Sequence, residues 1–231
     1  MDGFAAEFEV TAVERDPKRP GQYVVHIGGC EPISVHEDVL VKHRLMKGTR
    51  VDPEALRGVM EDEERHKAWS DALKYIGRRA RSEREMRLYL RRKGYSELWI
   101  DSIVGKLRDQ RYLNDADFAA QWTEQRMLTQ KKGRRLVKLE LKQKGVADQT
   151  VLDALRRVPE QEEERMAFDL GLKKWNQVSG TALDKKRKTA AYLLRRGYSS
   201  SIAGKVIRRL AAEVPTGESE RIESNFDPFD E

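Results

Sequence analysis

The feature that most constrains this fold is an internal repeat whose copies end on glycine. Three helix-like segments stop at Gly94, Gly145 and Gly197, and a leucine lies four residues before each glycine. The glycines are 51 and 52 residues apart. Glycine is favoured where a helix ends in the left-handed conformation, because a Cβ is strained there. The spacing therefore predicts three small helical units that cover one another, as in a repeat array, rather than one large core.

A second helix is predicted directly after each glycine. Apolar residues recur six, nine, ten and thirteen residues after each glycine, and these positions share one face of an α-helix. The short polar residues Ser96, Asp148 and Ser199 are predicted to cap these helices. A further helix is expected before each pair, with the marker residues Ala72, Leu73 and Ile76, then Phe118 and Trp122, then Met166, Leu170 and Trp175. Each unit is thus predicted to hold three helices.

The N-terminal part has a different pattern. Alternating residues from Phe8 and the run 23–27 flank a Pro- and Gly-containing turn, which predicts a β-hairpin with a third strand at 32–35. A short helix is expected over 36–45. Asp52-Pro53 predicts the start of a helix that runs to about Ile76. Ser82 and Glu85 have the spacing of a capping box.

The predicted fold class is mainly α, with tandem three-helix repeats and a small N-terminal β element. The expected boundaries are 1–50 for that element, 51–112 for the first repeat with its lead-in helix, 113–158 for the second, 159–212 for the third and 213–231 for an acidic disordered tail.

Charge is unevenly distributed along the chain, whose net charge is +6. Residues 65–158 hold 24 Lys/Arg and 12 Asp/Glu, and residues 185–212 hold nine basic residues and no acid. Residues 213–231 hold seven acids and one Arg. Basic surface of this kind attracts phosphates or acidic protein faces, although abundant Lys and Arg also simply solvate helices. Whether the acidic ends fold back on the basic units is left open.

Motifs for catalysis and for cofactors are missing. The sequence contains no phosphate-binding glycine loop, no HExxH and no cysteine pair, so neither an enzyme nor a cofactor is expected. His36 and His43 could share a helix face, but a solvated surface is the expected reading. Asn114 or Asp115 is expected to cap a helix rather than to bind calcium. One cysteine, Cys30, an acidic start and no long apolar run suggest a cytoplasmic chain.

An ordered set of motifs resembles the RecX family of RecA regulators. It comprises Arg81-Ser82-Glu83-Arg84-Glu85, Leu90, Lys93-Gly94, Tyr112-Leu113-Asn114-Asp115, Phe118-Ala119, Lys132-Gly133, Leu141 and Lys144-Gly145, and residues 34–42 resemble the N-terminal extension of Gram-positive members. The third unit departs from the first two, with Ala190-Ala191 where they carry Arg or Lys and then Leu. The resemblance implies a curved helical array that binds RecA and its filament on single-stranded DNA. It also implies that the protein limits filament growth, ATP hydrolysis and strand exchange without being an enzyme, and that it can contact DNA.

Basic side chains near the helix ends are the candidate contacts to RecA or DNA. They are Arg87, Arg91, Arg92, Lys93, Lys131, Lys132, Arg134, Arg135, Lys138, Lys142, Lys144, Lys185, Lys186, Arg187, Lys188, Arg195 and Arg196. The three residues Arg135, Lys138 and Lys142 are predicted to share one helix face. A monomer without membrane contact is expected. The alternative function is a stand-alone DNA-binding protein whose repeats contact the phosphate backbone.

Overall fold

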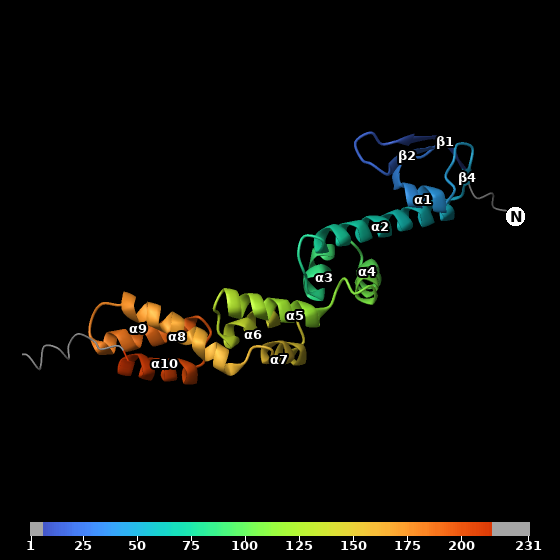
Figure 1. Cartoon of the computed structure of the whole chain (residues 1–231). Coiled ribbons are helices and arrows are strands. Elements are labelled where there is room, and N and C mark those ends of the chain that lie inside the picture. Colours follow the sequence, from blue (N-terminus) through green and yellow to red (C-terminus); the bar gives the residue numbers. More distant parts are fainter. Residues whose placement is uncertain (1–6, 214–231) are drawn as a thin grey trace, which may run out of the picture. The chain divides into compact units, whose positions relative to one another are not determined.

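The computed structural model describes residues 7–213 (Figure 1). The chain divides into two compact units. The first contains the residues up to Ala80 together with Met86–Tyr112, and the second contains Arg81–Glu85 together with the residues from Leu113. The predicted mainly helical class with a small N-terminal sheet is confirmed.

A four-stranded antiparallel sheet opens the first unit. Its strands are β1 (Phe8–Arg15), β2 (Gln22–Ile27), β3 (Ile33–His36) and β4 (Arg50–Val51), in the order β3-β2-β1-β4. The predicted hairpin and third strand are therefore confirmed. The sequence did not indicate β4, because two residues are too short to show an alternating pattern.

Two helices cover this sheet, and Figure 1 shows it lying beside both. Helix α1 (Glu37–Lys42) is shorter than the predicted 36–45, because His36 forms its N-cap and the chain leaves the helix at His43. Helix α2 (Pro53–Ile76) has the predicted bounds. Asp52 caps it, accepting a hydrogen bond from the Ala55 N–H at 2.7 Å. Buried valines of the strands and of both helices form the core between them.

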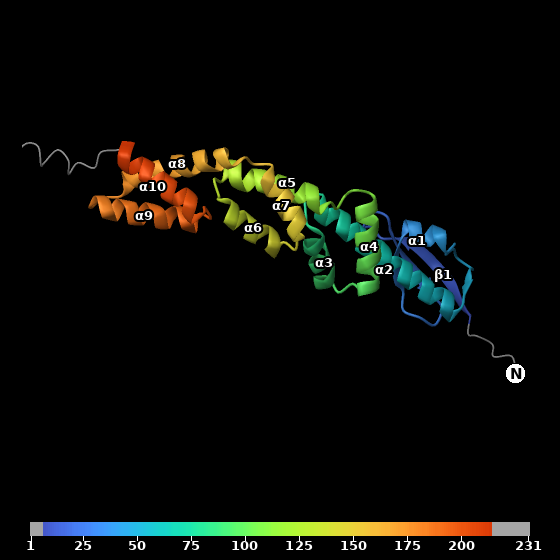
Figure 2. The same cartoon turned by 90° about the horizontal axis from the view of Figure 1, so that it is seen from below.

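Eight further helices follow and, with α2, make three three-helix domains. They are α3 (Glu83–Arg92), α4 (Glu97–Asp109), α5 (Asp115–Glu124), the π-helix η1 (Gln125–Thr129), α6 (Arg134–Gln143), α7 (Asp148–Arg156), α8 (Glu160–Gln177), α9 (Ala182–Arg195) and α10 (Ser200–Glu213), counting η1 as the end of α5. Helices α2 to α4 form the first domain, α5 to α7 the second and α8 to α10 the third. Figure 2 shows the helices of the second and third domains from below.

The glycine stops have the predicted conformation. Gly94, Gly145 and Gly197 have φ angles of 88°, 81° and 92°, in the left-handed region. The capping predictions are mostly confirmed, since Ser96 and Ser199 accept hydrogen bonds from the N–H groups three residues on. The prediction for Asp148 is wrong, because Ala147 is the N-cap. Asp148 instead lies in the first turn, where the helix dipole favours an acid.

The apolar faces predicted from the repeat form separate cores in the second unit. One core joins Phe118 of α5 with residues of α6 and α7, and another joins Trp175 of α8 with residues of α9 and α10. Trp175 is fully buried, which confirms its predicted place on the first helix of the third domain. The acidic segment that the sequence predicts to be disordered lies, apart from Glu213, outside the described residues.

Candidate protein- and phosphate-binding surface

Within the second unit, the start of α6 packs directly on the glycine turn that precedes α10. The Gly133 N–H donates to the Arg196 carbonyl at 2.8 Å, and the Arg135 N–H donates to the Gly197 carbonyl at 3.0 Å. A Cβ at Gly133 would lie 2.3 Å from the backbone carbon of Gly197. Only glycine fits at position 133, because no backbone contact this close is tolerated for a Cβ. The two domains therefore meet backbone to backbone.

An ion pair with a buried carboxylate closes this junction. Glu163 of α8 accepts hydrogen bonds from the Arg134 N–H at 2.8 Å and from Arg134 Nε at 3.0 Å. The Arg134 guanidinium also donates to the Val158 carbonyl. Arg196 likewise donates to a backbone carbonyl, that of Gln130, at 2.5 Å. Arg134 and Arg196 are thus both half-buried and bound to groups of this chain.

The start of α3 repeats this arrangement against the second domain. The Ser82 hydroxyl donates to the Lys144 carbonyl at 2.7 Å, and the Glu83 N–H donates to Asp115 at 2.9 Å. Burial raises the pKa of Asp115, although this hydrogen bond opposes the shift. Lys144 Nζ lies 2.5 Å from Glu85. Ser82 also accepts from the Glu85 N–H, while Glu85 accepts from the Ser82 N–H, so the predicted capping box is confirmed.

Most of the other candidate basic residues are paired with nearby carboxylates. The pairs are Arg87–Asp101, Arg91–Glu97, Lys93–Asp71, Lys131–Asp169, Lys132–Glu140, Lys142–Asp148 and Arg187–Asp184. The hydrogen bond from Arg91 lowers the pKa of Glu97, so this pair stays charged over a wide pH range. These charges are therefore offset within the chain.

Seven candidates have no carboxylate within ion-pair distance among the residues described, although the charge of Lys138 helps to lower the pKa of Asp148. They are Arg92, Arg135, Lys138, Lys185, Lys186, Lys188 and Arg195, called here the unpaired basic residues. Arg135 and Lys138 lie together, as their spacing predicts, and line a cavity of about 380 Å³ whose apolar wall includes Leu155 and Ile202. Lys142, from the same predicted face, binds Asp148 at 2.7 Å instead.

Tyr95 and Tyr198, which directly follow two of the glycine stops, differ in environment from each other and from Tyr112. Tyr198 is fully buried and donates to the Lys131 carbonyl at 2.9 Å, so it belongs to the core. Tyr95 donates to Asp71 at 3.0 Å. Tyr112, in contrast, is 57% exposed. Of the three, Tyr112 has the accessible ring that base stacking requires.

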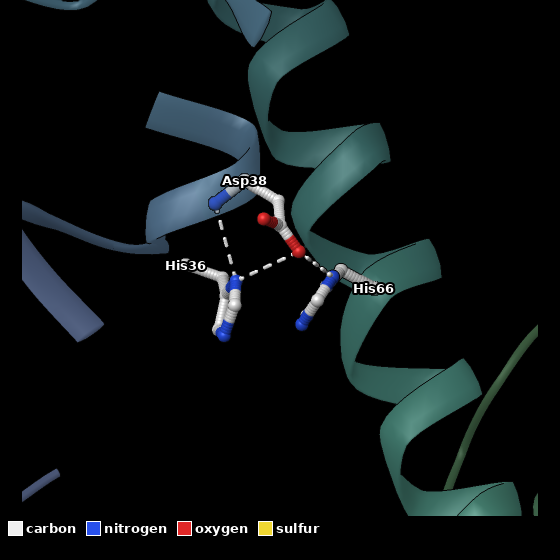
Figure 3. A group of neighbouring side chains, drawn as sticks. All are labelled: His36, Asp38 and His66. Atoms are coloured by element: carbon white, nitrogen blue, oxygen red, sulfur yellow. Dashed lines mark hydrogen bonds and ion pairs between the residues drawn. The ribbon is translucent and has the colours of Figure 1, made fainter. Parts of the chain in front are cut away.

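A cluster of two histidines and an aspartate ties the sheet to α2 (Figure 3). The rings of His36 and His66 stack with centroids 3.8 Å apart, and the Asp38 carboxylate lies 3.4 Å from His36 Nδ1. His36 Nδ1 already accepts the Asp38 N–H that caps α1. The same Asp38 oxygen lies 3.8 Å from His66 Nδ1, so the three side chains offer ligand atoms within 4.8 Å of one another. Because the lone pair of His36 Nδ1 already accepts a hydrogen bond within the chain, the cluster fits a packing role better than metal binding.

His43, which the sequence places with His36, lies elsewhere. Its Nε2 is 2.6 Å from Asp62, and Lys42 Nζ lies 2.5 Å from the same carboxylate. These hydrogen bonds lower the pKa of Asp62 against the opposing effect of its burial. The helices described contain no segment long and apolar enough to cross a membrane.

Comparisons with known proteins match these domains one by one. Models of the first, second and third three-helix domains of RecX match residues 68–107, 114–155 and 161–207. The regulatory protein RecX of Halalkalibacterium halodurans is 32% identical over 219 residues, which cover 93% of this chain and 81% of the relative. The protein of the same name from Bacillus cereus is 31% identical over 84% of this chain and 73% of that relative.

Solved structures agree with the sequence comparisons. A crystal structure of regulatory protein RecX matches with a TM-score of 0.68 and 27% identity, over 86% of this chain and 98% of that one. The crystal structure of RecX from Lactobacillus salivarius matches with a TM-score of 0.62 and 28% identity, over 65% and 99%. The three matched domains, in order, together with these relatives show that this chain belongs to the RecX family of regulatory proteins.

Proposed function

We propose that this protein regulates the RecA recombinase. It binds RecA and the RecA filament on single-stranded DNA, and it limits filament growth, ATP hydrolysis and strand exchange. Membership of the RecX family supports this proposal. The observation that carries it is the set of unpaired basic residues, because these charges are available to a partner without breaking a contact inside the chain.

The unpaired basic residues fall mainly on two helices of the second unit. Arg135 and Lys138 belong to α6, and Lys185, Lys186, Lys188 and Arg195 belong to α9. An exposed ammonium or guanidinium without a carboxylate partner attracts acidic protein surface or DNA phosphates over roughly a Debye length, about 8 Å at physiological salt. The paired candidates each have to give up an existing carboxylate first, so we assign direct contact to the unpaired set.

The remaining basic candidates are proposed to act indirectly. Arg134, Lys144 and Arg196 hold the starts of two helices against the neighbouring glycine turns. Fixing those junctions fixes the spacing between successive domains of the second unit. A partner with a regular surface, such as a filament, is recognised by such a spacing because several contacts then form at once.

The test is retention of the protein on RecA filaments assembled on single-stranded DNA, measured by co-sedimentation. The double variant Arg135→Glu and Lys138→Glu is compared with the double variant Arg156→Glu and Arg165→Glu. This control reverses the same amount of charge at two arginines that pair with Asp153 and Glu162. We expect the double variant to lose retention and the control to keep it. Equal retention on bare DNA and on the filament, for the unaltered protein, would contradict the proposal and favour the stand-alone DNA-binding alternative.

A further inference from the structure

The third domain lacks the surface ion pairs that join the second and third helices of the first domain. In that first domain, Arg87 pairs with Asp101 and Arg91 pairs with Glu97. Arg87 and Asp101 lie seven residues before and seven residues after Gly94. Arg91 and Glu97 lie three residues before and three residues after it. The second domain keeps one such pair, Lys142 with Asp148.

Both members of each pair are replaced in the third domain. Relative to Gly197, the equivalent positions are Ala190 and Gly204, and Leu194 and Ser200. Acid and base have been lost together, so this change leaves no unpaired charge behind. The outer face of α9 is instead partly apolar, with Leu194 46% exposed.

Two of the replaced positions, Ala190 and Leu194, lie on a stripe along α9 in which Ala190 is half-buried and the other members are exposed. Leu183, which is 75% exposed, lies seven and eleven residues before Ala190 and Leu194, so all three share one face of α9. Lys186 and Arg187 lie between them on the same side. We call these five residues the α9 stripe. It combines apolar side chains with positive charge.

Helix α9 also has a start unlike those of α3 and α6. It begins fifteen residues before its glycine, one turn earlier than the eleven of the other two. Thr181 caps it by accepting from the Asp184 N–H. In the two earlier domains, the residue twelve positions before the glycine, Ser82 or Gly133, packs on the next glycine turn. The equivalent residue in the third domain is Lys185, which lies inside α9. No later domain covers this end within the residues described.

The chain itself supplies a segment of matching chemistry. Residues 214–231 hold six acids and one arginine, together with Ile222, Phe226 and Phe229. Helix α10 ends at Glu213, at the same end of the third domain as the start of α9 (Figures 1 and 2). The stripe from Leu183 to Leu194 spans roughly 16 Å of helix. Thirteen extended residues from 214 to 226 reach up to about 45 Å, so the segment is long enough.

We propose that the α9 stripe is a docking surface for the acidic, phenylalanine-containing segment 214–231 of the same chain. Phe226 and Phe229 contact Leu183, Ala190 and Leu194, while the acids face Lys186 and Arg187. The contact of Arg187 with Asp184 is an exposed one of 3.5 Å, so an incoming acid can replace it. Linkage through the chain keeps the segment at a high effective concentration, which favours this pairing over free acidic ligands. The segment thereby competes with any acidic partner for the basic end of the third domain.

The experiment places a spin label next to the phenylalanines of the full chain. Cys30 is replaced by serine, and the substitution Ser224→Cys introduces a new cysteine. The spin label therefore attaches at position 224 alone. We expect loss of the methyl signals of Leu183 and Leu194 from NMR spectra. The signals of Leu139 and Leu98, which are also exposed leucines, stay unchanged. Lys186→Glu together with Arg187→Glu restores the lost signals, as does high salt.

Two outcomes would overturn the proposal. One is a labelled chain in which the methyl signals of Leu183 and Leu194 are no weaker than those of Leu139 and Leu98. The other is loss of the α9 signals in a mixture where the label and the observed methyl groups are on different molecules, because the occupant is then a second copy. RecA is absent from every sample, so the result does not depend on the proposed function.

Discussion

The Ser82 hydroxyl donates to the Lys144 carbonyl 62 residues away, at 2.7 Å. Ser82 lies twelve residues before its glycine, and Lys144 lies one residue before the next. The same two positions in the following repeat are Gly133 and Arg196, which are joined by a backbone hydrogen bond of 2.8 Å. The second unit therefore uses one rule twice: the start of a middle helix binds the last carbonyl before the next glycine.

Replacing Ser82 by alanine is expected to cost more than the loss of an ordinary helix cap. Ser82 caps α3 and also satisfies the Lys144 carbonyl. The cap is worth about 1 kcal/mol, and the second hydrogen bond about 1 kcal/mol more. Ser96→Ala, which removes only a cap, is the matched control. The free energy of unfolding in urea measures both, and equal losses would show that the contact with Lys144 contributes nothing.

Gly133→Ala is expected to destabilise the second unit strongly. The new Cβ meets the backbone of Gly197 and Tyr198, which no side-chain movement can relieve. Overpacking of this kind costs about 3 kcal/mol. Gly204→Ala is the control, because its nearest neighbour is the end of the Arg208 side chain at 3.6 Å and an alanine inside α10 lowers the entropy of the unfolded chain. Thermal unfolding is expected to show Tm lowered for the first variant and slightly raised for the second.

The repeat made the helices predictable and left the junctions unpredicted. Gly94, Gly145 and Gly197 identified the helix ends because the left-handed conformation restricts the residue itself. Asp148 was misassigned as a cap because a first-turn acid and a capping acid look alike in sequence. The buried carboxylate of Glu163 was missed, since its partner Arg134 is 29 residues away. Aligning the repeats on their glycines places Ser82 and Gly133 at the same position, twelve residues before Gly94 and Gly145. A small residue at that position in both repeats is the sequence signal that could have revealed the junction.

The local sequence pattern also could not predict which candidate basic residues form ion pairs. Arg91 and Glu97 are six residues apart across a turn, and Lys131 and Asp169 are on different domains. Such pairs depend on how helices pack, and sequence spacing fixes only neighbours on one helix. The common face of Arg135 and Lys138 was predictable for that reason.

The packing of the sheet on α2 is expected to weaken in mild acid. Burial is the main cause that lowers the pKa of His66 below its usual 6.5, and His36 adds to the shift. The unfolded chain therefore binds a proton at a higher pH than the folded chain does, so stability falls as the pH drops below about 6.5. Urea unfolding at a series of pH values measures this. His66→Gln should flatten the dependence, and a stability that rises on acidification would contradict this assignment.

Binding through the unpaired basic residues is expected to depend steeply on salt. Each phosphate contact releases counterions, so the affinity for single-stranded DNA falls as salt rises. Changing Lys138 and Lys185 to glutamate should weaken binding and reduce the slope of log affinity against log salt. The control that changes both Arg156 and Arg165 to glutamate should affect the two quantities less, because each arginine is paired with an acid on its own helix. Fluorescence anisotropy of labelled DNA over a salt series supplies both numbers.

The most direct test of the central claim is DNA-dependent ATP hydrolysis by the cognate RecA, titrated with this protein. DNA binding by the protein alone is followed in parallel. The account predicts that hydrolysis falls at protein concentrations too low to coat the DNA, and that the Arg135→Glu, Lys138→Glu variant loses this effect. Unchanged hydrolysis up to stoichiometric protein, alongside tight and salt-sensitive binding to DNA alone, would contradict it.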